Sequence, residues 1–278
     1  MQSKEIMEIT PAKLQGKVNI PPSKSVAHRA IICASLAHGE SVISNISFSD
    51  DIKATIDCMR SLGAKIVEKG DTLHIQGCSN KIDADVKFDC NESGSTLRFM
   101  VPIALAKNGG QNLFVGRGKL GTRPLDIYEK ICKEQNISYI NDSQNNVENL
   151  LDLKVKGQLR SGVFSVKGNV SSQFITGLMF ALPTLDSDSE IAIEGELQSK
   201  GYLDLTLSAL KDFGIEIVNE NYKRFLIKGK QKYLPRNYRV EGDWSQATFY
   251  ELANYLGNNG DMQGLNVDSE QGDKDIVN

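Results

Sequence analysis

Residues 17–36, KVNIPPSKSVAHRAIICASL, contain the pattern that is repeated along most of this chain. The alternating segment 17–20 predicts a strand, and the two prolines after it end that strand. The mainly apolar run 26–36 is too long for a strand and predicts a buried helix. The segment Ser23-Lys24-Ser25 stands just before it, where serine favours the start of a helix.

The stretch that follows completes a unit of six elements. Further strands are predicted at 41–46, 65–67 and 72–75, with a second helix at 52–62. The order is therefore strand, helix, strand, helix, strand, strand, and it recurs twice. In the second copy a strand at 86–88 leads through Ser93-Gly94-Ser95-Thr96 to a helix at 97–106. In the third, a strand at 162–166 leads through Ser171-Ser172-Gln173 to a helix at 174–182.

The ends of the second helices also match between copies. Gly63 and Gly214 follow the helices of the first and third copies, and glycine at this point favours the left-handed conformation that ends a helix. A fourth copy starts at 238–243, and its first helix is expected to open at Trp244. It is expected to break off inside its second helix, so we expect the chain to be a fragment of a longer protein.

Composition and charge exclude several classes of protein. The 278 residues carry a formal net charge of -3 and a pI of about 5.7, without the basic surface expected of a nucleic-acid binder. No apolar run is long enough to span a membrane, and the N-terminus does not resemble a signal peptide. The scattered cysteines form no Cys-x-x-Cys pair and predict reduced thiols in a cytoplasmic protein: Cys33, Cys58, Cys78, Cys90 and Cys132.

The start of each first helix predicts an anion site. Helix N-termini present unpaired N–H groups and the positive end of the helix dipole, and serine or glycine there lets an anion approach the backbone. A threefold arrangement of the repeats brings three such starts together. Four cations are expected to share the pocket: Lys24, Arg29, Arg98 and Arg123.

Several single residues have two interpretations each. Arg29 lies in an apolar helix and needs a partner, for which an anion is preferred over a structural carboxylate. Arg98 fits an anion or an ion pair with Asp50 or Asp51 equally well. Tyr202 fits either core packing or stacking on a ring-shaped ligand. The histidines show no metal-ligand spacing and are expected on the surface or in packing: His28, His38 and His74.

These motifs resemble, in order, those of the 5-enolpyruvylshikimate-3-phosphate synthase family, also called 3-phosphoshikimate 1-carboxyvinyltransferase. The resemblance covers the whole chain, and its strongest elements are the segments 22–30 and 92–98. It continues through Arg123-Pro124, 170–174, 199–202 and 240–243. It implies an α/β enolpyruvyl transferase fold in which pseudo-threefold β-α-β-α-β-β repeats form an inside-out α/β barrel.

The resemblance also implies a division into domains. Residues 22–237 are expected to form a complete first domain of three repeats. Residues 1–21 and 238–278 are expected to form part of a second domain, because the first strand region of the family crosses to that domain.

The implied reaction moves the enolpyruvyl group of phosphoenolpyruvate to the 5-hydroxyl of shikimate 3-phosphate, in the shikimate pathway to chorismate and the aromatic amino acids. No cofactor and no metal is implied, and the expected protein is a monomer that binds these two small anions, without nucleic acid or membrane. Lys24 is the implied catalytic residue. Shikimate 3-phosphate is expected on Lys24, Ser25, Arg29, Ser171, Ser172, Gln173, Ser199 and Tyr202. Phosphoenolpyruvate is expected on Lys24, Gly94, Arg123 and Gln173.

The family's acid–base carboxylates have no match in this sequence, so we expect residues 1–278 to bind shikimate 3-phosphate with negligible turnover. Two alternatives are a non-catalytic phosphate-binding module and an RNA-end-modifying protein, which the acidic pI disfavours. A third is the related transferase that acts on UDP-N-acetylglucosamine. That family carries a cysteine shortly before an Arg-Pro pair, and the matching stretch 116–124 has none.

Overall fold

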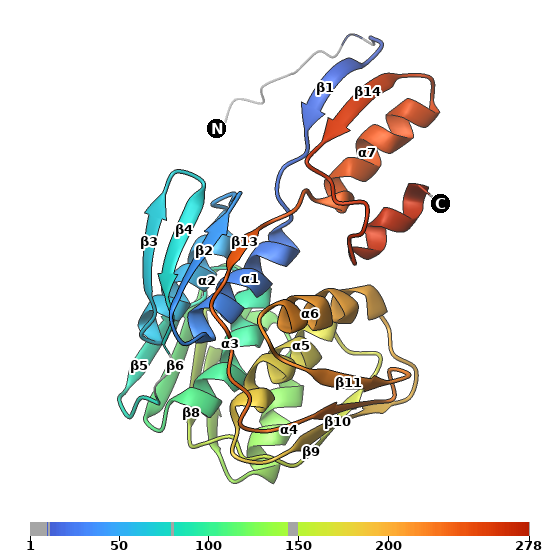
Figure 1. Ribbon diagram of the computed structural model, residues 1–278. Coiled ribbons are helices and arrows are strands. Elements are labelled where there is room, and N and C mark those ends of the chain that lie inside the picture. The colour runs from blue at the N-terminus through green and yellow to red at the C-terminus, as the bar shows by residue number, and fades with distance from the viewer. Residues whose placement is uncertain (1–9, 11, 79–80, 144–149, 278) are drawn as a thin grey trace, which may run out of the picture.

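The computed structural model describes residues 10, 12–78, 81–143 and 150–277. Its larger part contains three four-stranded sheets on the outside and helices in the middle (Figure 1). The second repeat comprises β5 (Val86–Asp89), α3 (Gly94–Lys107), β6 (Gln111–Gly116), α4 (Asp126–Glu134), β7 (Ser138–Asn141) and β8 (Leu151–Lys156). The third comprises β9 (Val163–Lys167), α5 (Ser172–Ala181), β10 (Ser189–Glu194), α6 (Lys200–Asp212), β11 (Ile217–Glu220) and β12 (Arg224–Ile227).

The first repeat obtains one strand from far along the chain. Its own segment supplies α1 (Lys24–Leu36), β2 (Glu40–Ser44), α2 (Asp50–Ser61), β3 (Lys65–Lys69) and β4 (Thr72–Gln76). The missing strand is β13 (Asn237–Arg239), which pairs parallel with β2 as β5 does with β6 and β9 with β10. The three sheets then share one order, and the β-α-β-α-β-β repeat predicted from the sequence is confirmed.

The prediction that residues 17–20 form the first strand of this repeat is wrong. They belong to β1 (Gln15–Asn19), which pairs parallel with β14 (Asn259–Gln263) in a separate two-stranded sheet. Because β13 occupies the position beside β2, β1 forms its backbone hydrogen bonds with β14 instead. The predicted domain boundary at 237/238 falls inside β13, since Tyr238 and Arg239 pair with Ile43 and Ser44.

The middle of the larger part is made of helices buried on nearly all sides. In α1 every residue from Val26 to Leu36 is buried, and α3 and α5 are buried over most of their length. Helices α3 and α5 approach closely at Gly177, where an added Cβ would overlap the Arg98 carbonyl and lie 3.0 Å from Pro102 Cγ, both on α3. These central helices therefore fix the relative positions of their N-termini.

The helix ends follow the sequence signals. Gly63 and Gly214 both have positive φ, of 104° and 79°. The equivalent position in the second repeat is Asn136, with φ 57°, because asparagine is the other residue that tolerates this conformation well.

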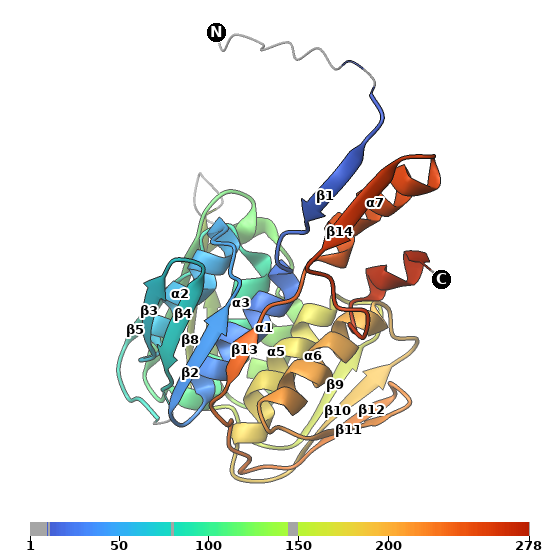
Figure 2. The same ribbon diagram turned by 45° about the horizontal axis from the view of Figure 1, so that its top comes forward.

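The C-terminal part is smaller and stands apart from the three sheets (Figure 2). It contains β1, β14, α7 (Trp244–Tyr255) and the 3₁₀ helix η4 (Gly272–Val277), around a small cluster of Ile20, Trp244 and Ala247. Two neighbouring segments connect it to the larger part, held together by the hydrogen bonds Ser23 N–H to Glu241 O and Asp243 N–H to Pro21 O. Over the described residues, no helix is both long and apolar enough to cross a membrane.

Candidate functional site

A cavity of about 240 Å³ lies where the first turns of α1, α3, α5 and α6 meet. All eight residues expected to bind shikimate 3-phosphate line it, together with His28, Ser95 and Phe99. The eight are Lys24, Ser25, Arg29, Ser171, Ser172, Gln173, Ser199 and Tyr202. The repeat thus brings together side chains from four separate parts of the chain.

The serines at these helix starts differ in how their hydroxyls are used. Ser93 and Ser171 cap α3 and α5 by accepting hydrogen bonds from Thr96 N–H and Gln173 N–H. Ser199 makes no side-chain cap for α6 and has the left-handed backbone conformation, with φ 59°. This conformation is costly for serine, and such strain is typical of functional sites. Its exposed hydroxyl is therefore available to a ligand.

Arg29 is buried and satisfied by neutral acceptors. Its Nε donates to Thr206 Oγ1 at 2.9 Å, and its two terminal nitrogens donate to the carbonyls of Ser25 at 2.7 Å and Tyr202 at 3.0 Å. No carboxylate pairs with it among the described residues. Burial lowers the pKa of Arg29 to about 10, so the group is still charged at neutral pH. The cavity therefore holds an uncompensated positive charge, which favours an anion.

Gln173 is held in one orientation by two side chains of α3. Arg98 donates to its Oε1 at 2.8 Å, and its Nε2 donates to Ser95 Oγ at 2.8 Å. Arg98 also stacks on Phe174, with 4.8 Å between Cζ and the ring centre. The considered ion pair of Arg98 with Asp50 or Asp51 is absent among the described residues. Arg98 thus fixes Gln173 and does not itself line the cavity.

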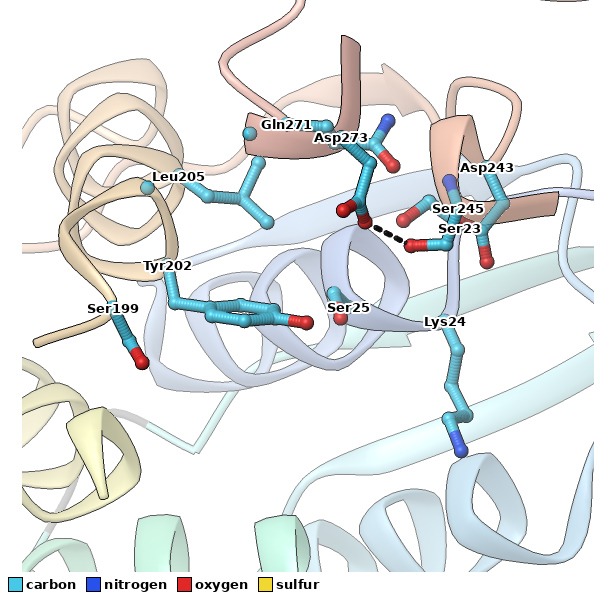
Figure 3. Close-up of a pocket in the computed structure, with 12 residues that line it drawn as sticks. Ser23, Lys24, Ser25, Ser199, Tyr202, Leu205, Asp243, Ser245, Gln271 and Asp273 are labelled. Atoms are coloured by element: carbon cyan, nitrogen blue, oxygen red, sulfur yellow. Dashed lines mark hydrogen bonds between the residues drawn. The ribbon is translucent and has the colours of Figure 1, made fainter. Parts of the chain in front are cut away.

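Lys24 and Tyr202 border a second, adjoining cavity of about 340 Å³, which faces the C-terminal part. Tyr202 is 48% exposed and points from α6 towards Ser25 (Figure 3), so the core interpretation of this residue is wrong. The Lys24 ammonium lies 2.7 Å from the Asp51 carboxylate on α2. The Lys24 side chain is 53% exposed and lines both cavities.

The remaining two predicted residues lie together beside the start of α3. The guanidinium of Arg123 lies directly over Gly94, where an added Cβ would be 3.1 Å from Arg123 Cζ. Arg123 is exposed, and its guanidinium makes no hydrogen bond or ion pair within the described parts of the chain. Neither Gly94 nor Arg123 lines the 240 Å³ cavity, whereas Lys24 and Gln173 do. The expected phosphoenolpyruvate residues thus lie around the edge of that cavity.

The cavity is also lined by His28, Ser95 and Phe99. Sequence reasoning assigned Ser95 a role only as part of a helix start predicted to bind an anion, and it assigned His28 and Phe99 no site role. His28 is 2% exposed, and its Nδ1 lies 2.7 Å from Thr55 Oγ1. Burial lowers its pKa to about 3. Helical spacing was the available signal, because positions four apart share a face and His28 follows Lys24 by four.

Comparison with known proteins agrees with the repeat and the motifs. The family model described as EPSP synthase (3-phosphoshikimate 1-carboxyvinyltransferase) matches residues 9–278. Proteins named 3-phosphoshikimate 1-carboxyvinyltransferase from Clostridium beijerinckii, Clostridium perfringens (strain 13) and Clostridioides difficile (strain 630) are 54%, 57% and 56% identical over 98%, 97% and 98% of this chain. The chain spans 62–63% of the length of these relatives.

A solved structure of EPSP synthase from Acinetobacter baumannii has the same fold. Its TM-score is 0.74 at 18% identity, and the match covers 92% of this chain and 57% of that one. The fold is therefore the α/β enolpyruvyl transferase fold predicted from the motifs. Because the family model matches nearly all residues of this chain, the chain belongs to the EPSP synthase (3-phosphoshikimate 1-carboxyvinyltransferase) family.

Proposed function

We propose that this protein takes part in the transfer of the enolpyruvyl group from phosphoenolpyruvate to the 5-hydroxyl of shikimate 3-phosphate. The observation that carries this proposal is the 240 Å³ cavity, which is lined by all eight residues expected to bind shikimate 3-phosphate. It combines a buried guanidinium, a half-exposed ammonium and hydroxyls at helix starts, a set of donors suited to a small phosphorylated acid.

The proposed ligand positions follow from the type of each donor. Ser171, Ser172 and Ser199 lie at the starts of α5 and α6, where hydroxyls and helix N–H groups suit the phosphate. Ser25 and Arg29 line the α1 side of the same cavity. Tyr202 offers its ring face along the cyclohexene ring.

Phosphoenolpyruvate is proposed to bind between Lys24, Gly94, Arg123 and Gln173. The Arg123 guanidinium has no partner among the described residues, and Gly94 lets an anion approach the backbone at the start of α3. Lys24 belongs to both sites and is the proposed catalytic residue. Its ammonium can stabilise negative charge that develops between the two substrates.

We propose that residues 1–278 alone bind shikimate 3-phosphate without appreciable turnover, because nothing in this sequence matches the family's acid–base carboxylates. We also propose that 22–237 form a first domain of three repeats and that 1–21 and 238–278 belong to a second; residues 1–9, 11 and 278 lie outside the described residues. The pairing of β13 with β2 favours moving the exchange point to just after Arg239.

A titration of the 278-residue chain with shikimate 3-phosphate tests this function. Binding measured by calorimetry is expected, with loss of about tenfold or more in affinity for Arg29→Met, since hydrogen bonds to charged groups are worth about 1.5–3 kcal/mol. Lys53→Met, on an exposed position of α2, is the matched control. The absence of both binding heat and thermal stabilisation at millimolar ligand would contradict the proposal.

Turnover is tested separately by a phosphate-release assay. The chain alone is expected to be inactive and to gain activity when mixed with the C-terminal third of a full-length relative. Binding without activity in either case would favour the phosphate-binding module. We further propose that the protein is cytoplasmic and monomeric. The monomer is proposed because one chain supplies all eight residues of the cavity, and sedimentation velocity tests it.

A further inference from the structure

His28 occupies a position in the cavity that the proposed function leaves without a role. It lies on α1 between residues of the site and is buried, with its ring edge-on to Phe99 at a centroid distance of 6.2 Å. Its Nδ1 points to Thr55 on α2, and Thr55 does not line the cavity. The opposite edge of the ring carries Nε2, which therefore lies on the side of the ring away from Thr55.

A chain of hydrogen bonds fixes the tautomer of His28. The Thr96 hydroxyl donates to Ser93 Oγ at 2.7 Å, with the carbonyl of Asp51 as a second acceptor at 3.3 Å. Because the single proton of the Thr96 hydroxyl is used in this way, Thr96 must accept a hydrogen bond from the Thr55 hydroxyl, 2.7 Å away. Thr55 then has only lone pairs to offer, so His28 donates to it from Nδ1–H. Nε2 is left as a bare acceptor.

This acceptor has no partner. Nε2 is one of four buried side-chain polar atoms without a hydrogen bond among the described residues, and of the four residues only His28 lines the 240 Å³ cavity. Burying a polar atom without a partner is unfavourable, so such an atom at a ligand cavity calls for a donor from the ligand. The low pKa of His28 keeps the ring neutral, so it cannot offer Nε2–H to an anion by protonation.

We propose that His28 is a ligand-binding residue whose Nε2 accepts a hydrogen bond from a free ring hydroxyl of shikimate 3-phosphate. The inference rests on the proposed function and adds a selective contact to it. The other lining groups include the cations Lys24 and Arg29 and several hydroxyls, which suit the phosphate and the carboxylate. An acceptor-only nitrogen instead selects a hydroxyl and rejects a carboxylate or phosphate oxygen that has no proton to donate.

The test combines two His28 variants with ligands that lack one hydroxyl each. His28→Asn keeps a polar atom near Thr55 and removes the one at Nε2, while His28→Gln places a polar atom near the position of Nε2. Calorimetry on the 278-residue chain uses shikimate 3-phosphate and its 4-deoxy and 5-deoxy analogues. His28→Asn is expected to lose about tenfold in affinity for the full ligand, and less than about twofold for the analogue that lacks the paired hydroxyl. His28→Gln should retain more affinity, and the exposed His74→Asn is the control.

Nitrogen NMR of the ¹⁵N-histidine-labelled chain provides a readout that a purely structural role would not move. With three histidines in the sequence, the His28 ring is assigned by comparison with His28→Asn. An unprotonated Nε2 whose resonance shifts on binding is expected. Equal losses of affinity of His28→Asn for the full and deoxy ligands, or an Nε2–H tautomer, would overturn the inference. Binding of shikimate 3-phosphate by the wild type would still support the proposed function in that case. Failure of the wild type to bind shikimate 3-phosphate would remove both.

Discussion

Acidification should destabilise this protein through His28, and the size of the effect follows from its burial. The pKa of the ring is lowered from an ordinary 6.5 to about 3, chiefly because the protonated form loses its hydration inside the protein. Between these two values the unfolded chain binds a proton that the folded chain does not bind. The free energy of unfolding is therefore highest above pH 6.5 and falls as the pH drops towards 3.

The free energy of unfolding should fall by about 2 kcal/mol between pH 7 and pH 5, since each pH unit below 6.5 lowers it by about 1.4 kcal/mol. Urea denaturation at pH 7, 6 and 5, followed by circular dichroism, measures it. Trp244 is the single tryptophan and lies in the C-terminal cluster, so its fluorescence would report on the wrong region. His28→Gln has no titrating ring and should lose about 2 kcal/mol less than the wild type over this range. The exposed His74→Gln should behave like the wild type.

The comparison of slopes separates this effect from the cost of the substitution itself, which is present at every pH. Protonation of carboxylates changes the free energy of unfolding mainly below pH 5, and this change is the same in all variants. If the wild type and His28→Gln lost the same free energy of unfolding from pH 7 to pH 5, the argument from burial would be refuted.

Three further substitutions test other parts of the structure. Gly177→Ala places a methyl group 2.6 Å from the Tyr128 hydroxyl and should lower the free energy of unfolding by about 1–3 kcal/mol, measured by urea denaturation. Gly94→Ala meets only the movable end of Arg123, so stability should change little, whereas calorimetry should show weaker phosphoenolpyruvate binding in the presence of shikimate 3-phosphate. Trp244→Ala should speed hydrogen exchange in β1 and β14 and leave exchange in α1, α3 and α5 unchanged, because its cluster is separate from the main core.

The repeat was predictable because its signals are local. Serines before apolar runs mark the starts of α1, α3 and α5, and Gly63 and Gly214 mark the ends of α2 and α6. These signals depend on neighbours within a few residues. They also located the cavity, since equivalent helix starts in a threefold repeat meet at one place.

The local sequence pattern predicted neither the strand exchange nor the partners of the buried arginines, and only the family resemblance implied that the first strand crosses to a second domain. A strand pattern at 17–20 is the same whether its partner is β2 or β14, because pairing depends on residues far away in the sequence. Within the chain, backbone carbonyls, Thr206 and Gln173 accept the hydrogen bonds of Arg29 and Arg98, in place of the carboxylates that were the structural alternative for both. Every residue carries a carbonyl, so composition gives no sign of which one a guanidinium will find.

The late arrival of β13 has a consequence for synthesis on the ribosome. Arg236 N–H reaches Ser41 Oγ across 195 residues, and β2 has no parallel neighbour until β13 has been made. The first repeat to emerge is thus the last whose sheet can be completed, and its β2 edge stays open while the second and third repeats fold. During that interval the nascent chain presents a template for pairing with other chains. The edge is protected only when the sequence has passed Arg239.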